Sequence, residues 1–254
     1  MYILISPAKT LDISTYSSNL PSSQPTFKSD ADKIAAILRK KQPKDLSKLM
    51  HISDDLARLN YERYQQWKNL SDQQLKEAIF TFKGDVYQGL DANTLRNEDL
   101  QFAQKHLRIL SGIYGLLRPL DKIAPHRLEM GTKLSVGKYS GLYVYWKTKL
   151  IKQISTEMKS LNTNVLINLA SNEYFKSVNL KGTKLDVVSP VFKDNKNGEY
   201  KIISFYAKRA RGLMARHLIK EKAISKEALL SFEEEGYHYN DALSSHGKPV
   251  FTRG

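Results

Sequence analysis

Apolar residues along the chain follow two patterns, short continuous runs and longer stretches in which they recur every three to four positions. The short runs have the length and composition of buried strands. Strands are expected at residues 2–5, 163–171, 183–192 and 250–252. The segment Asn195–Gly198, with the sequence NKNG, is typical of a hairpin turn, and it predicts that residues 187–194 pair with residues 199–207.

The longer, periodic stretches predict helices, and several carry the expected start and stop residues. Residues 29–41 begin with acidic side chains, end with cations and are followed by Pro43, while Ser53 is a good N-cap for the next stretch. Helices are expected over 29–41, 53–70, 94–110, 208–222 and 225–236, and residues 71–92 begin as a helix or break into a strand near Phe80. The Ser-rich segment 13–29 is expected to be a surface loop.

Helices and strands are interspersed along the chain, which favours the α/β (α+β) class with a mixed sheet and flanking helices. A length of 254 residues without a Pro/Gly-rich linker predicts one domain, 1–254. No apolar run approaches the ~20 residues of a membrane span, and the N-terminus lacks the basic region of a signal peptide. A cytoplasmic protein without membrane contact is therefore expected.

The charge balance is the most informative feature of the composition. Forty basic and 26 acidic side chains give a net charge of +14, which points to a polyanionic partner, most often nucleic acid. The alternative is a merely basic protein. Cysteine is absent, which excludes disulfides, thiol catalysis and thiolate metal sites.

The segment YAKRARGLMARHLIK, residues 206–220, concentrates this charge. On a helical wheel its cations lie opposite an apolar face. The cations are Lys208, Arg209, Arg211, Arg216 and Lys220, and the apolar face contains Ala210, Leu213, Met214, His217 and Leu218. Solvated helix faces usually mix signs, so a face of one sign favours phosphate binding, although a solvated face is the alternative. Gly212 predicts close approach of a neighbouring element or a ligand.

The segment 107–123 resembles a helix-hairpin-helix, in which glycines let backbone N–H groups approach a DNA phosphate. Gly112 and Gly115 would form the hairpin, with Arg108 and Arg118 nearby. An ordinary turn between packed helices is the alternative reading.

Polar residues follow apolar segments at two further places. Glu129, in the turn-rich segment 125–134, and Glu173, after the strand near 163–171, are candidates for an acid/base pair, with Arg127 beside them. An internal salt-bridge network is the alternative. Ser6 and Lys9 match a serine–lysine nucleophile pattern, for which anion contact by Lys9 is the favoured reading.

Metal chemistry finds little support in the sequence. The histidines lack the spacing of common metal motifs, and no cofactor-binding motif occurs. His238 and His246 with Asp241 are the remaining metal candidate, and we expect no metal site there.

Six segments in this order resemble the YaaA peroxide-stress family of bacteria, and they extend from residue 3 to residue 253. The segments are ILISPAKTLD, FKGDVYQGLDA, LRILSGIYGLLRPLDKIAPHRLEMGTKL, INLASNEYFKSV, YAKRARGLMARHLI and FTR. The resemblance implies a cytoplasmic DNA-binding protein of the hydrogen-peroxide response that limits damage from free iron. It also implies one α/β domain of unusual topology with a positively charged cleft and a helix-hairpin-helix, which here would fall at 110–117.

The leading expectation is therefore sequence-independent binding of DNA, either duplex or repair intermediates, through phosphate contacts. The residues assigned to it from local charge are Lys9, Arg108, Gly112, Gly115, Arg118, Arg127, Lys133, Lys208, Arg209, Arg211 and Arg216. One rival is an enzyme acting on a nucleotide or nucleic acid with Glu129, Glu173 and Arg127 in the cleft. The other is direct iron binding by carboxylates and imidazoles.

Overall fold

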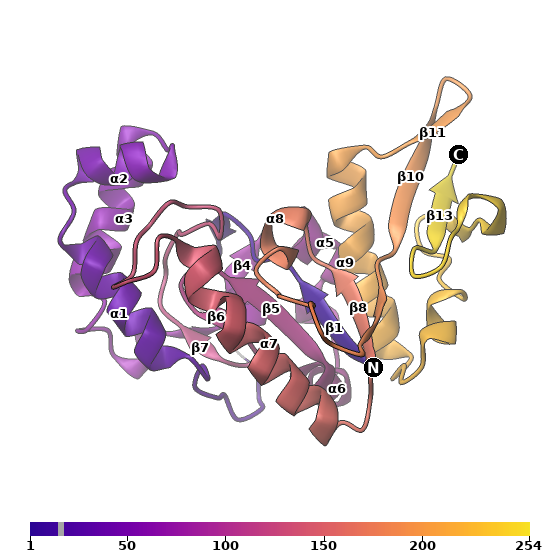
Figure 1. The fold of residues 1–254 in the computed structure, drawn as a ribbon, viewed down its shortest axis with the longest axis horizontal. Helices are drawn as coiled ribbons and strands as arrows, with labels where there is room; N and C mark the ends of the chain where they lie inside the picture. The colour runs from indigo at the N-terminus through magenta and orange to yellow at the C-terminus, as the bar shows by residue number, and fades with distance from the viewer. Residues whose placement is uncertain (15–17) are drawn as a thin grey trace.

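A five-stranded sheet crosses the middle of the protein in the order β6-β5-β1-β8-β9 (Figure 1). The structure, a computed structural model, describes residues 1–14 and 18–254. The strands are β1 (Tyr2–Ile5), β5 (Leu107–Ser111), β6 (Gly115–Leu117), β8 (Val165–Leu169) and β9 (Asp186–Val188). β1 is parallel to both neighbours, with Ile3 opposite Leu107 and Ile167, whereas β6 runs antiparallel to β5.

Helices cover both faces of this sheet, which explains why β1 is apolar at every position and buried throughout. Helix α7 (Leu142–Ser160) lies on one face, and α5 (Asp85–Leu90), α6 (Asn97–His106) and α9 (Ser204–Lys220) lie on the other (Figure 1). The fold is a single α/β domain with mixed sheets, as the interspersed pattern predicts.

A second sheet stands at the C-terminal side of the molecule, with the strand order β11-β10-β13-β12. Its strands are β10 (Val191–Lys196), β11 (Glu199–Lys201), β12 (His238–Tyr239) and β13 (Val250–Arg253). The predicted hairpin is confirmed, because Asn197 and Gly198 take positive φ values of 57° and 83° and connect the antiparallel strands β10 and β11.

Three helices form the opposite side of the molecule (Figure 1). They are α1 (Lys28–Arg39), α2 (Pro43–Met50) and α3 (Asp54–Gln66). The predicted N-cap of α3 is confirmed, since the Ser53 side chain accepts a hydrogen bond from the Leu56 N–H. Pro43 follows the end of α1, as predicted. It also begins α2, a helix that the sequence pattern did not reveal, because proline is favoured in the first turn of a helix.

Short elements occupy the stretch 71–92 and replace the predicted helix 225–236, and the break to a strand expected near Phe80 is found at Phe82–Lys83. The stretch 71–92 contains a 3₁₀ turn, two short strands and two short helices. They are the 3₁₀ turn Asp72–Gln74, β3 (Lys76–Glu77), α4 (Ala78–Thr81), β4 (Phe82–Lys83) and α5. The expected helix 225–236 is only a 3₁₀ segment, Lys226–Leu229. The predicted loop 13–29 falls partly on residues 15–17, which lie outside the described part of the chain.

The helix-hairpin-helix prediction is wrong. Helix α6 ends at His106, and residues 110–117 belong to the β5–β6 hairpin inside the central sheet. Gly115 has φ +68°, and a Cβ there would lie 2.6 Å from the Trp146 ring. A Cβ at Gly112 would lie 2.3 Å from the Leu128 carbonyl oxygen. Both glycines therefore permit a tight turn and close packing in the interior, where a DNA phosphate has no access.

The structure also bears on membrane contact. Among the helices of the described residues, none has both the length and the apolar character needed to cross a bilayer.

Candidate functional site

The order of the parallel strands creates a crevice at one end of the central sheet. From β1 the chain continues to β5 on one side, and from β5 it crosses to β8 on the other side of β1. Where successive connections leave a parallel sheet in opposite directions, the loops after the strands separate, and ligands of α/β proteins bind there. In this chain the loops concerned begin at Ser6 and at Ala170.

A cavity of about 570 Å³ occupies this position, and we call it the switch-point cavity. Three segments of the chain and one helix face enclose it. Its lining consists of Ser6–Thr10, Lys83–Tyr87, Ser171–Tyr174, Lys208 and Arg211. The two loops are joined by the Ser6 hydroxyl, which accepts a hydrogen bond of 2.8 Å from the Ser171 N–H.

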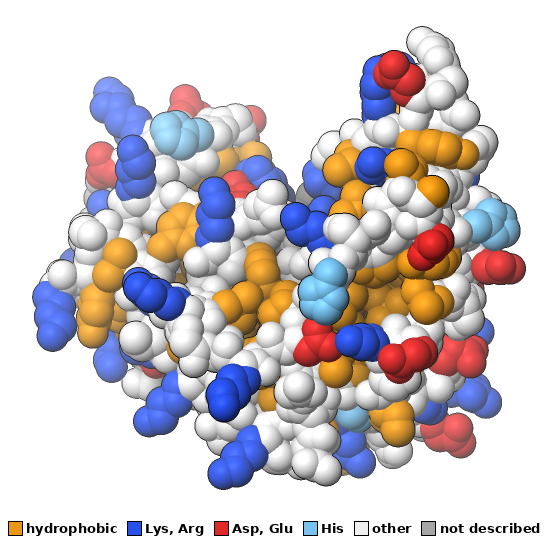
Figure 2. All heavy atoms as spheres, turned by 45° about the vertical axis from the view of Figure 1, so that its right-hand side comes forward, with side chains coloured by type: hydrophobic (Ala, Val, Ile, Leu, Met, Phe, Trp, Pro, Cys, Tyr) orange, Lys and Arg blue, Asp and Glu red, His pale blue; other side chains and the backbone are white. Residues whose placement is uncertain are grey.

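A second cavity, of about 490 Å³, adjoins the first and extends toward the end of α2. Its lining consists of Lys48–His51, Glu129, Gly131–Lys133 and Glu173. Glu173 lines both cavities, so the two meet at its side chain, and we call the pair the groove. Figure 2 shows a deep hollow between the two raised sides of the molecule, with lysine and arginine side chains along it.

Glu129 is at the centre of an ion-pair cluster in the groove. One carboxylate oxygen lies 3.0 Å from the Lys9 ammonium, and the other lies 3.0 Å from a terminal nitrogen of Arg127. The Nε of Arg127 is buried without a hydrogen-bond partner. Three of the predicted site residues are thus brought together, and the salt-bridge network expected as the alternative is present.

Glu173 is less engaged than Glu129. It belongs to the short helix α8 (Asn172–Phe175), and its Oε1 accepts a hydrogen bond of 3.2 Å from the Gly131 N–H. No ion pair involves it within the described residues. Burial and the neighbouring Glu173 and Glu129 carboxylates raise the pKa of Tyr174, which therefore remains a neutral phenol.

The cations of α9 separate into two groups. Lys208 and Arg211, three positions apart, line the switch-point cavity and form no ion pair within the described chain. Burial lowers the pKa of Arg211, and no neighbouring acid compensates the desolvation of its guanidinium. Arg209 instead forms an ion pair with Glu235, and its Nε lies 2.9 Å from both carboxylate oxygens. Arg216 donates to the Leu90 and Asp91 carbonyls at the end of α5.

Two glycines fix the distance between α5 and α9. A Cβ at Gly212 would lie 1.9 Å from the Val86 carbonyl oxygen, and one at Gly89 would lie 2.2 Å from the Arg209 carbonyl oxygen. The close approach predicted at Gly212 is thus a contact with a neighbouring helix. It brings the end of β4, which carries Lys83, beside the cations of α9.

Two more of the predicted cations, besides Arg209 and Arg216, lie outside the groove. Arg108 is 5% exposed, and its Nε donates a 2.7 Å hydrogen bond to Glu157 of α7. Arg118 pairs with Asp121 at 3.1 Å. Together with the glycines of the β5–β6 hairpin, these residues maintain the fold and are not available to a ligand in the groove.

The serine–lysine pair lacks the geometry of a nucleophile and its base. Ser6 precedes a loop and the short strand β2 (Thr10–Leu11), so it is not at the start of a helix. The Lys9 side chain is 62% exposed and paired with Glu129, whereas a lysine base must be held neutral by burial. Lys9 therefore remains an anion-binding candidate.

Sequence reasoning did not identify Lys48 or Lys83, which line the groove without an ion pair in the described residues. Lys48 lies at the end of a helix that was not predicted. Lys83 lies in the segment FKGD, whose glycine was a visible signal of a turn beside a strand.

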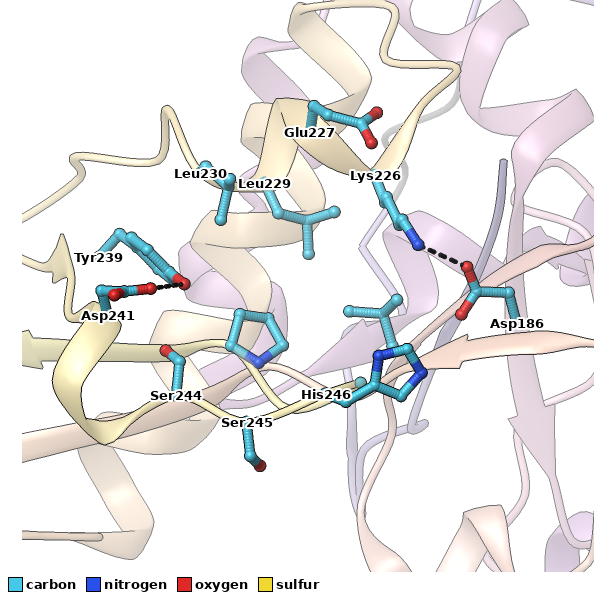
Figure 3. A pocket seen from close by; sticks show the side chains of 13 residues that line it. Asp186, Lys226, Glu227, Leu229, Leu230, Tyr239, Asp241, Ser244, Ser245 and His246 are labelled. Carbon is cyan, nitrogen blue, oxygen red and sulfur yellow. Dashed lines mark hydrogen bonds and ion pairs between the residues drawn. The ribbon is translucent and has the colours of Figure 1, made fainter.

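A further cavity, of about 430 Å³, lies in the C-terminal part of the chain (Figure 3). Lys226 and Asp186 form an ion pair of 2.8 Å at its edge, and Tyr239 donates to Asp241. The metal candidates Asp241 and His246 line it. Among the described residues, no three His, Asp or Glu side chains are grouped so as to hold a metal ion.

Comparisons with known proteins agree along the whole chain. A family profile described as "Peroxide stress protein YaaA" matches residues 1–243. The chain is 50% identical to a UPF0246 protein of Aliivibrio fischeri over all of this chain and 98% of that protein. It is 48% identical to a UPF0246 protein of Teredinibacter turnerae and 46% identical to one of Saccharophagus degradans, in each case over all of this chain and 99% of the relative.

Proposed function

Because the chain belongs to the YaaA peroxide stress protein family, we propose that it acts in the peroxide response by binding DNA along the groove without sequence preference. The observation that carries this proposal is a set of cations in the groove that no carboxylate neutralises. Its members are Lys48 and Lys133 in the cavity beside α2, and Lys83, Lys208 and Arg211 in the switch-point cavity.

These five side chains form no ion pair within the described residues, whereas Arg108, Arg118, Arg209 and Lys222 are each paired with an acid. Like charges placed together repel one another, so such a set is stabilised by a polyanion in the groove. Phosphate contacts by lysine and arginine give affinity through counterion release and carry no sequence information.

A direct test is the affinity for labelled duplexes of unrelated sequence at low salt, measured by fluorescence anisotropy. Equal affinities for the duplexes support the proposal, because the contacts go to phosphates. The variant Lys133→Gln should weaken binding of every duplex to a similar extent, whereas Lys105→Gln, at the far end of α6, should leave binding unchanged. Absence of binding at low salt would remove the proposal.

A second candidate function is catalysis on a nucleotide or nucleic acid, and it is favoured by the position of Glu173. This carboxylate lies where the two cavities meet, at the carboxyl end of β8, and no cation is paired with it in the described chain. Glu129 is a weaker candidate for a base, since both of its oxygens are engaged by cations.

The variant Glu173→Gln separates the two functions. It retains the oxygen that accepts from the Gly131 N–H but removes the capacity to take a proton. DNA binding without catalysis predicts that affinity for DNA and cell survival under peroxide remain at the level of the unchanged protein. Loss of survival at unchanged DNA affinity would establish the catalytic candidate.

A further inference from the structure

Four cations and two carboxylates line the switch-point cavity. Lys208 and Arg211 of α9 and Lys83 before α5 contribute the positive charge. Lys9, which is paired with Glu129, is the other cation of the lining, and the rest combines apolar and neutral polar groups with the carboxylates of Asp85 and Glu173. A phosphate is attracted to these unpaired cations and repelled by the carboxylates, so a ligand with a single anionic group is drawn toward the cations by that group.

The rest of the lining suits a planar, polar body. Pro7, Ala8 and Val86 supply apolar surface, and Tyr87 and Tyr174 supply buried rings. The Tyr87 hydroxyl donates a 3.0 Å hydrogen bond to the Ser6 carbonyl oxygen, which fixes its ring against the loop after β1. A volume of about 570 Å³ is within the range of cavities that enclose small ligands.

Polar groups without a protein partner complete the lining. In the described residues, the Asn172 side chain forms no hydrogen bond, and the carboxylate of Asp85 forms neither a hydrogen bond nor an ion pair. Both are available to hydroxyl and amino groups of a ligand. A sugar with a base presents such groups on the side opposite to its phosphate.

From this arrangement we propose that the switch-point cavity binds one nucleoside monophosphate, with its phosphate on Lys208 and Arg211 and its sugar and base between the loops after β1 and β8. The site goes beyond duplex binding along the groove, with which it shares Lys208 and Arg211, since it recognises the whole unit and not the phosphate alone. The unit comes either from free nucleotide or from a DNA strand in the groove, because the chemistry is the same.

Isothermal titration with dAMP tests the proposal on the intact protein. We expect a dissociation constant below about 1 mM, which is well within reach of a charged, enclosed site. Arg211→Gln should weaken dAMP binding by about tenfold or more, because it removes a charge-assisted contact with phosphate. The control Lys220→Gln, an exposed cation at the far end of the same helix, should leave the affinity unchanged.

Two further titrations identify what the cavity recognises. Inorganic phosphate should bind more weakly than dAMP, because it lacks the sugar and base. If dAMP binding is abolished when saturating duplex is present, the cavity receives a unit of the strand; if both bind together, it serves free nucleotide.

The proposal is overturned if dAMP does not bind, if phosphate binds as tightly as dAMP, or if Arg211→Gln and Lys220→Gln behave alike. Duplex binding measured on the same samples keeps this result separate from the groove proposal. Duplex binding without dAMP binding removes the nucleotide site alone, and dAMP binding without duplex binding removes the groove proposal alone.

Discussion

Gly212 and Gly89 hold α9 and α5 at a distance that no side chain permits. At each position a Cβ would lie within 2.2 Å of a carbonyl oxygen of the other helix. Backbone atoms cannot move aside as the end of a flexible side chain can. Glycine costs ~1 kcal/mol in a helix, and the close packing that it permits offsets this cost. The packing brings Lys83 and Lys208 to the same cavity.

We predict that Gly212→Ala lowers the free energy of unfolding by about 2 kcal/mol or more, despite the better helix propensity of alanine. Urea-induced unfolding measures the change. Gly141→Ala is the control, because a Cβ there meets nothing within 4 Å, and its cost should be about 1 kcal/mol or less. Equal stabilities of the two variants would contradict the close contact.

His126 illustrates how burial sets the protonation state of a single side chain. It is 5% exposed among the rings of Tyr114, Trp67 and Phe82, and its Nδ1 lies 2.8 Å from the Ala124 carbonyl oxygen. Burial, with a smaller contribution from the Arg63 charge, lowers the pKa of His126 from 6.5 to about 4. The neutral imidazole, with Nδ1 as donor, is thus the form that the fold accommodates.

The pH dependence of stability follows from this shift. Between pH 6.5 and 4 the unfolded chain binds a proton at His126 more readily than the folded chain does, so stability falls as the pH is lowered through this window. From pH 7 to pH 5, His126 should contribute a loss of about 2 kcal/mol. Urea unfolding of His126→Phe should show a correspondingly smaller loss, and an identical loss in both proteins would contradict the assignment.

At the scale of elements, α9 combines two functions in one helix. Arg209 and Arg216 hold it to Glu235 and to the end of α5, while Lys208 and Arg211 face the switch-point cavity. The charge pattern alone did not distinguish these pairs, because their partners come from segments distant in sequence.

The division of α9 gives a prediction with opposite outcomes for two arginines. Arg216→Gln should lower the free energy of unfolding by about 1 kcal/mol, since it removes hydrogen bonds to two carbonyls, and should leave DNA affinity unchanged. Arg211→Gln should weaken DNA binding with little loss of stability. The buried Arg211 guanidinium has no acidic partner, so its charge does not stabilise the free protein. Urea unfolding and fluorescence anisotropy on the same samples measure both effects. A reversed pattern would contradict the assignment.

The elements that the sequence predicts well are those with local signals. The strand at Tyr2–Ile5, the α3 N-cap at Ser53 and the turn at Asn195–Gly198 all follow from residues close in sequence. The β5–β6 hairpin was mistaken for helices because leucine and isoleucine suit both, and burial against Trp146 decides the outcome. A positively charged cleft was expected from the family resemblance, and Lys133, Lys208 and Arg211 were assigned to phosphate binding from local charge. Its walls were not predicted, since they come from α2, α8 and α9.

For the whole molecule, the net charge of +14 is less informative about function than the positions of the lysine and arginine side chains that form no ion pair. Elsewhere in the described chain, Arg108, Arg118 and Arg209 are paired with acids, whereas exposed lysines such as Lys105 and Lys220 form no ion pair but do not line the groove. Along the groove, five unpaired cations line two adjoining cavities. Figure 2 shows a hollow with lysine and arginine side chains along it. This arrangement is what a strand of regularly spaced phosphates requires.

The salt dependence of duplex binding measures these contacts most directly. With five cations engaged, a plot of log affinity against log salt concentration should have a slope of about −4 to −5. In the double variant Lys208→Gln/Arg211→Gln, the slope should become shallower by about 2. The control Lys105→Gln/Lys220→Gln removes the same charge at the far ends of α6 and α9 and should keep the slope. A slope near zero, or the same change in both double variants, would contradict the account.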